Sequence, residues 1–177
     1  MVQQYGYSLL ELLCVLAILS LLAHLGSSHF LSVNQDLENQ RTLKTEVARL
    51  ANGLTQARQL AVASGRLSYL CGGVRHCTGD WSTGFRVYQH SESGQAEKTF
   101  TSISFASSLL VAWRGFPAQK TQIEYQLNGL SGYQNGTFVF CLGRWKMALV
   151  LNQSGRFYVS SLQSLPQSAP LSVEDCT

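Results

Sequence analysis

One carboxylate, Glu11, stands inside an otherwise apolar segment near the start of the 177-residue chain. From Leu9 to Leu25 the sequence reads LLELLCVLAILSLLAHL, in which Ser20 and His24 are the other polar residues. A carboxylate in lipid costs a few kcal/mol unless a positive group neutralises it or it reaches the interface. Glu11 would therefore need a cationic partner in its apolar environment, which makes it a functional candidate.

Basic and aromatic residues concentrate in two short segments near the C-terminus, Gly143-Arg144-Trp145-Lys146 and Gly155-Arg156-Phe157-Tyr158. Arginine and lysine pair with phosphates, and an aromatic ring stacks on an unpaired base. A hairpin through residues 152–155 would join the segments. The candidate DNA-binding residues are Arg144, Trp145, Lys146, Arg156 and Tyr158. The alternative interpretation is a solvated turn with ordinary core aromatics.

The five cysteines divide into Cys14, in the apolar segment, and four in the remainder of the chain. In an oxidising periplasm an even number predicts two disulfides, and four cysteines allow three connectivities. We favour Cys71 with Cys77, closing a short loop, and Cys141 with Cys176, fastening the C-terminal tail. Cys14 is expected to pack or to face lipid.

No residue pattern predicts a metal site, a cofactor or catalysis. Cys71, His76, Cys77 and His90 lack the paired spacing of zinc ligands. The chain has no Gly-x-Ser-x-Gly elbow, phosphate loop or His-Glu-x-x-His motif. We therefore expect no metal, no cofactor and no enzymatic activity.

The charges are unevenly distributed. The chain has 13% charged residues and a net charge of +3, which argues against a disordered tail or a nucleic-acid packaging protein. From residue 48 onward, eleven Lys and Arg residues face six Asp and Glu residues, a surplus of about five positive charges. A polyanion is therefore a possible partner.

The elements that would position these residues are one long helix and a set of short strands. The apolar run, extended to Val33, approaches the length of a membrane span. Beyond it, apolar residues recur at spacings of three and four, which predicts one buried helix face, and Ser64-Gly65 supplies a stop. The residues of this face are Leu43, Val47, Leu50, Leu54, Ala57 and Ala61.

After Gly65, alternating and β-branched or aromatic runs predict antiparallel strands. We expect residues 43–61 to cover one of the resulting sheets, in an α+β fold, and residues 161–177 to form an extended tail. The expected strands are Leu67–Cys71, Phe85–Gln89, Thr99–Phe105, Leu109–Trp113, Gln122–Leu127, Thr137–Cys141, Met147–Leu151 and Arg156–Ser160.

The string Gly6-Tyr7-Ser8-Leu9-Leu10-Glu11 resembles the type IV prepilin signature. The resemblance implies that prepilin peptidase cuts after Gly6 and that the new N-terminal residue, Tyr7, is methylated. It also implies that Glu11 pairs with the N-terminal ammonium of a neighbouring subunit during assembly. The expected leader, residues 1–6, departs from the family in having no Lys or Arg, which leaves the position of the true start codon open.

The body resembles the FimT/GspH branch of minor pilins and pseudopilins. The motifs that carry this resemblance are Ala57-Arg58, Leu70-Cys71, Trp81-Ser82-Thr83-Gly84-Phe85, Gly136-Thr137-Phe138-Val139-Phe140-Cys141 and Gly155-Arg156. FimT-type pilins bind DNA through a Gly-Arg-x-Arg motif, whose second arginine is replaced here by Tyr158.

The resemblance implies a pilin-like fold of four parts: a leader (1–6), a membrane and assembly half of the helix (7–33), a periplasmic half (34–65) and a globular β domain (66–177). It implies a single-pass inner-membrane protein with a periplasmic domain, incorporated into a filament with other pilins. The expected function is that of a type IV minor pilin near the pilus tip that aids biogenesis and contacts DNA during transformation. The alternative is a GspH-type minor pseudopilin of a type II secretion system.

Overall fold

The computed structural model describes residues 8–91 and 97–165, except for the side chains of residues 23–32. The chain divides into two compact units, Met1–Glu38 and Asn39–Thr177. The first contains the start of a long helix, and the second contains the end of that helix together with all the strands that the structure describes.

Helix α1 runs from Leu9 to Ser64, as the sequence predicts. It ends at Gly65, which has a φ of +62°. A left-handed residue directly after the last turn is a common helix stop, and glycine adopts it without steric cost. The predicted apolar face is confirmed, because all six of its residues are at most 1% exposed: Leu43, Val47, Leu50, Leu54, Ala57 and Ala61.

The first unit has the opposite character, with leucines exposed around the helix. Leu9, Leu10, Leu12 and Leu13 are each more than half exposed, and Glu11 lies among them in the first turn. In the part of the chain that the structure describes, no helix reaches the length and hydropathy required of a membrane span.

In the described ranges nine strands follow α1, and eight of them correspond to the eight predicted strands. Their bounds are β1 Ser68–Gly72, β2 Gly84–His90, β3 Glu97–Ser104, β4 Leu110–Phe116, β5 Gln122–Tyr125, β6 Asn135–Leu142, β7 Trp145–Leu151, β8 Phe157–Val159 and β9 Gln163–Ser164. Strand β9 was not predicted. It falls in the stretch that was assigned to an extended tail, because a two-residue strand has no detectable periodicity.

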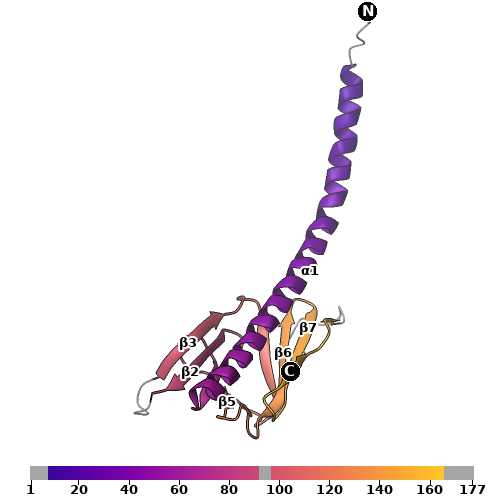
Figure 1. The fold of residues 1–177 in the computed structure, drawn as a ribbon. Helices are drawn as coiled ribbons and strands as arrows, with labels where there is room; N and C mark the ends of the chain where they lie inside the picture. Colours follow the sequence, from indigo (N-terminus) through magenta and orange to yellow (C-terminus); the bar gives the residue numbers. More distant parts are fainter. Residues whose placement is uncertain (1–7, 92–96, 166–177) are drawn as a thin grey trace, which may run out of the picture. The chain divides into compact units, whose positions relative to one another are not determined.

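The strands form two antiparallel sheets (Figure 1). The first has the order β3-β2-β1-β5, and the second has the order β4-β6-β7-β8. Strand β9 also pairs with β7, with Trp145 opposite Ser164 and Lys146 opposite Gln163. Consequently β7 has β6 on one side and both β8 and β9 on the other.

The main hydrophobic cluster joins the second half of α1 to both sheets. Leu70 and Phe85 of the first sheet and Phe138 and Leu149 of the second belong to the same buried cluster as Leu50. Figure 1 shows the helix crossing in front of both sheets. The expectation that the helix would cover one sheet was therefore wrong, because the sheets lie side by side and share its apolar face.

The structure describes four of the five cysteines. Cys71 and Cys77 form a disulfide, and Cys141 is also disulfide-bonded. Its predicted partner, Cys176, lies outside the described residues. Cys14 is a free, exposed cysteine on α1.

Candidate nucleic-acid interface

The second sheet carries a row of four cross-strand neighbours near one end. Arg114 lies opposite Thr137, Thr137 opposite Val150, and Val150 opposite Tyr158. Directly opposed residues project from the same face of a sheet. The alternate positions of β6 and β7 belong to the core beneath α1, so this row faces away from the helix.

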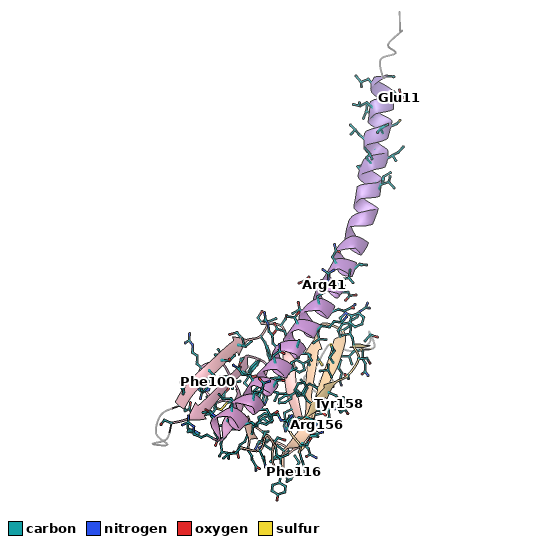
Figure 2. The ribbon with its side chains drawn as sticks, viewed as in Figure 1. Glu11, Arg41, Phe100, Phe116, Arg156 and Tyr158 are labelled. Atoms are coloured by element: carbon teal, nitrogen blue, oxygen red, sulfur yellow. A yellow bond between two sulfur atoms is a disulfide. The ribbon has the colours of Figure 1, made fainter. Side chains whose placement is uncertain are left out.

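A second row lies at the extreme end of the same sheet. Phe116 is paired with Asn135, and Arg156 immediately precedes the pairing of Phe157 with Leu151. Phe116 and Tyr158 are 66% and 64% exposed, and Arg114 and Arg156 are exposed as well. We call these four residues, Arg114, Phe116, Arg156 and Tyr158, the sheet-end surface. Figure 2 shows Arg156 next to Tyr158 in projection and Phe116 extending from the end of the domain.

The turn between β7 and β8 fixes the position of Arg156. Asn152 donates its backbone N–H to the Arg156 carbonyl (3.0 Å), and its side-chain Oδ1 accepts the Arg156 N–H (3.0 Å). Asn favours such turns because its side chain bonds to nearby backbone groups. The predicted hairpin from β7 through residues 152–155 is confirmed.

The turn also packs closely on the loop that precedes β6. Gly155 has a φ of +72°, and a side chain there would collide with the carbonyl oxygen of Gly129. Ser131, which is fully buried, donates its hydroxyl to the Asn152 carbonyl (2.8 Å). Gly155 and Ser131 are both small, as the close approach of the two backbone segments requires. Arg156 is therefore held on a constrained scaffold.

Two glycines face each other at the end of β4 that carries Arg114 and Phe116. Gly115 lies opposite Gly136, and a Cβ on either would come within 3 Å of the Trp113 ring. A glycine inside a strand often marks such a close approach. The predicted strand ended at Trp113, so it left out both Arg114 and Phe116.

The structure separates the two segments that were predicted to form one DNA site. Arg144 precedes β7, whereas Arg156 lies beyond its far end, bonded to Asn152. Asn152 follows Arg144 by eight residues, which is about 26 Å along the strand. Lys146 shares the outer face with Val150, about 13 Å from it at 3.3 Å per residue. Arg144 and Lys146 are each engaged in interactions within the chain.

Trp145 belongs to the core side of the second sheet. It is half-buried, packs against the main hydrophobic cluster, and its indole Nε1 is buried with no hydrogen-bond partner in the described part of the chain. Strand alternation explains this placement, because Trp145 has the opposite parity to Lys146. The structure thus removes Trp145 from the candidate surface and retains Arg156 and Tyr158.

Arg58 of α1 adds a further positive charge near this end of the domain. It is half-buried and lies close to Gly129 and to the phenol of Tyr125. Burial raises the pKa of Tyr125 above its ordinary value, and the nearby Arg58 charge partly opposes that shift. Arg58 and Arg156 line the same groove.

The predicted processing and assembly residues belong to the first unit or precede it. Glu11 is exposed in the first turn of α1. Gly6 and Tyr7 lie outside the described residues. The structure therefore gives no geometry for the cleavage site, and its assignment continues to rest on the sequence signature.

Arg114 and Phe116 were not identified from the sequence, although one signal was present. They alternate with Trp113 and Gly115 in the string Trp-Arg-Gly-Phe, which is consistent with a strand that has one polar and aromatic face. Their place on the same sheet face as Tyr158, three strand spacings away, was not predictable, because it depends on the register of three strand pairs.

Comparison with known proteins gives two family matches. Residues 46–155, more than half of the chain, match the family model described as type II transport protein GspH. Residues 1–26 match the prokaryotic N-terminal methylation motif. No curated protein matches the chain significantly.

Two crystal structures of the type IV minor pilin FimU from Pseudomonas aeruginosa PAO1 are similar to this chain. The first has a TM-score of 0.57 at 19% identity and covers 69% of this chain and 90% of FimU. The second, from another crystal form, has a TM-score of 0.55 at 19% identity and covers 67% and 93%. At this identity the likeness establishes a common fold.

Proposed function

The chain belongs to the family of the type II transport protein GspH, and on this basis we propose that it serves as a minor pilin of a type IV pilus, incorporated at or near the tip. The expected membership of the minor pilin and pseudopilin class is confirmed, as is the pilin-like α+β fold. The proposal adds the kind of filament, a role in its biogenesis, and contact with DNA during natural transformation.

The sheet-end surface is the observation that carries the DNA contact. Arg114 and Arg156 supply positive charge, and Phe116 and Tyr158 supply exposed rings beside it. Arginine bonds to phosphate oxygens, and exposed rings stack on bases. Among residues 8–91 and 97–165 these groups are exposed, and the turn at Asn152 holds Arg156 in place, so they suit a polyanionic ligand.

The exposed leucines of the first unit support an assembly role. A helix that is apolar all round requires lipid or other helices to cover it. Glu11, exposed among Leu9, Leu10, Leu12 and Leu13, would need a cation in either setting. We propose that the helix first anchors the chain in the inner membrane, with the globular domain in the periplasm, and later packs in the filament. There Glu11 would pair with the N-terminal ammonium of a neighbouring subunit.

The DNA contact is tested by gel-shift titration of the full chain in detergent against duplex DNA at two salt concentrations. We expect binding that weakens as salt rises, because phosphate contacts release counterions. Absence of binding at 50 mM NaCl would remove DNA from the function.

A role as a minor pseudopilin is the second candidate, and the GspH family match favours it. Deleting the gene separates the two roles, because loss of a pilus protein should reduce uptake of labelled DNA and leave protein secretion intact. The reverse pattern would assign the chain to a type II secretion system.

Processing is tested with Gly6→Ala, assayed by mass spectrometry of the chain isolated from membranes. We propose that prepilin peptidase removes residues 1–6 and that Tyr7 is then methylated. The variant should therefore accumulate at full length with an unmodified N-terminus. Normal maturation of Gly6→Ala would exclude this cleavage site.

A further inference from the structure

A groove of about 720 Å³ lies between the last turns of α1 and the turn that leads into β8. The helix contributes one wall, and residues 155–157, which include Arg156 of the sheet-end surface, contribute the other. The lining residues are Thr55, Arg58, Gln59, Val62, Ala63, Gly155, Arg156 and Phe157. All of them belong to the second unit, so the groove is formed within one compact part of the chain.

Positive charge in this groove is not compensated by the surrounding residues that the structure describes. Arg58 and Arg156 make no side-chain hydrogen bond or ion pair within residues 8–91 and 97–165, and no lining residue is acidic. Two arginines that line one groove favour an anion with several acceptor oxygens. A phosphate has that character.

The remaining lining offers both apolar surface and hydrogen-bonding groups. Val62 is 54% exposed and lies beside Ala63 and the half-buried ring of Phe157. Thr55 and Gln59 add a hydroxyl and an amide on the helix side. Sites of about 300–1,000 Å³ with this mixture suit one small organic group. A groove of this size accommodates a nucleotide and excludes a double helix.

The surroundings distinguish a nucleic acid from an acidic peptide. Arg156 belongs both to the groove and to the sheet-end surface, where Arg114 and Tyr158 continue the pattern of charge and exposed ring. An acidic peptide side chain would need a single cationic site. A ligand with regularly repeated phosphates and bases matches a basic and aromatic surface that extends beyond the groove.

We propose that the groove holds an unpaired nucleotide of a DNA strand, its phosphate between Arg58 and Arg156 and its base against Val62 and Phe157. This assignment rests on the proposed DNA contact and makes single-stranded DNA the preferred ligand. The neighbouring nucleotides would then extend across the sheet-end surface toward Tyr158.

The test is fluorescence anisotropy with the full chain in detergent, at 50 mM and 200 mM NaCl. The probes are a labelled 20-nucleotide oligo(dT) and a labelled 20-base-pair duplex. We expect the single strand to bind at least about threefold more tightly than the duplex, since only an unpaired base can enter the groove and pack against the Phe157 ring. Arg58→Gln should lower the affinity for oligo(dT) about three- to tenfold and reduce the preference.

Two further variants separate groove binding from general effects. Ala63→Leu fills an exposed part of the groove without changing charge, and it should also reduce the preference for oligo(dT). Arg41→Gln removes an exposed arginine from the same helix, about 25 Å from Arg58 at 1.5 Å per residue, and should leave the preference unchanged. Circular dichroism checks that each variant is folded.

The outcomes distinguish this assignment from the proposed function. Equal affinity for the two probes, or equal losses for both in Arg58→Gln, would overturn the nucleotide groove and leave the DNA contact standing. An acidic, leucine-rich peptide could instead displace labelled oligo(dT) at a lower concentration than unlabelled oligo(dT) does. That result would assign the groove to a protein segment. Failure of both probes to bind at 50 mM NaCl would overturn both proposals.

Discussion

The hydroxyl of Ser131 donates a hydrogen bond to the backbone carbonyl of Asn152, 2.8 Å away. The two residues are 21 positions apart in the sequence and lie in different loops. The backbone N–H of Ser131 also donates to the Gln153 carbonyl at 3.2 Å. These bonds join the loop before β6 to the turn after β7. The position of Arg156 therefore depends on a buried serine that does not contact the proposed ligand.

Ser131→Ala should destabilise the domain by about 0.5–1.5 kcal/mol, because it removes the hydrogen bond from the hydroxyl of the buried Ser131 to the Asn152 carbonyl. The free energy of unfolding in urea measures the effect. Ser104→Ala, at an exposed strand position, is the matched control and should change stability by less than about 0.5 kcal/mol. Equal effects of the two substitutions would show that the Ser131 bond contributes nothing specific.

Gly155→Ala and Gly65→Ala form a second matched pair, with φ values of +72° and +62°. Both substitutions place a side chain in the left-handed region, at a cost of about 1–2 kcal/mol. At Gly155 the new methyl group would also collide with the Gly129 carbonyl oxygen, whereas the space around Gly65 is open. Urea unfolding should therefore show a clearly larger loss for Gly155→Ala. Similar losses would indicate that the turn can shift without cost.

Alkaline pH should destabilise the domain through its buried tyrosines. Burial raises the pKa of Tyr125, and burial together with the Glu97 carboxylate raises the pKa of Tyr88 to about 12. The unfolded chain loses these protons near pH 10 while the folded chain keeps them, so the free energy of unfolding falls as pH rises. The slope is at most about 1.4 kcal/mol per pH unit for each tyrosine.

Tyr125→Phe tests this prediction with little other disturbance, because the Tyr125 hydroxyl has no hydrogen-bond partner among the described residues. The variant should be about as stable as the parent at pH 8 and should lose less stability between pH 9 and pH 11. Tyr133→Phe, at an 83% exposed position, should follow the parent curve. A Tyr125→Phe curve parallel to that of the parent would rule out the ionisation of Tyr125 as a cause.

The sequence predicted those features of the fold that depend on local periodicity. The buried face of α1 from Leu43 to Ala61 follows a helical repeat, and Gly65 ends the helix at its predicted position. Eight strands were recognisable from alternation and turn residues. In contrast, the division into two sheets and the pairing of β9 with β7 depend on tertiary contacts that have no local signature.

The candidate surface was only partly predictable for the same reason. Arg156 and Tyr158 form a short basic and aromatic string that can be recognised in the sequence, and the structure leaves both exposed. Arg114 is 42 residues before Arg156, and only the register through β6 and β7 brings it onto the same face. Trp145 lies on the core side of the sheet, because strand parity, not composition, decides whether a side chain faces the core.

The most direct test of the DNA contact compares two double variants in the salt dependence of duplex binding. Arg114→Ala/Arg156→Ala removes two charges from the sheet-end surface, and Arg41→Ala/Arg75→Ala removes two exposed charges elsewhere. Each phosphate contact contributes about 0.9 to the slope of log K against log salt, so the first variant should lower that slope by about 1.8. Its affinity at 50 mM NaCl should also fall, while the second variant binds like the parent. Equal slopes for the parent and Arg114→Ala/Arg156→Ala would contradict the assignment of this surface to DNA.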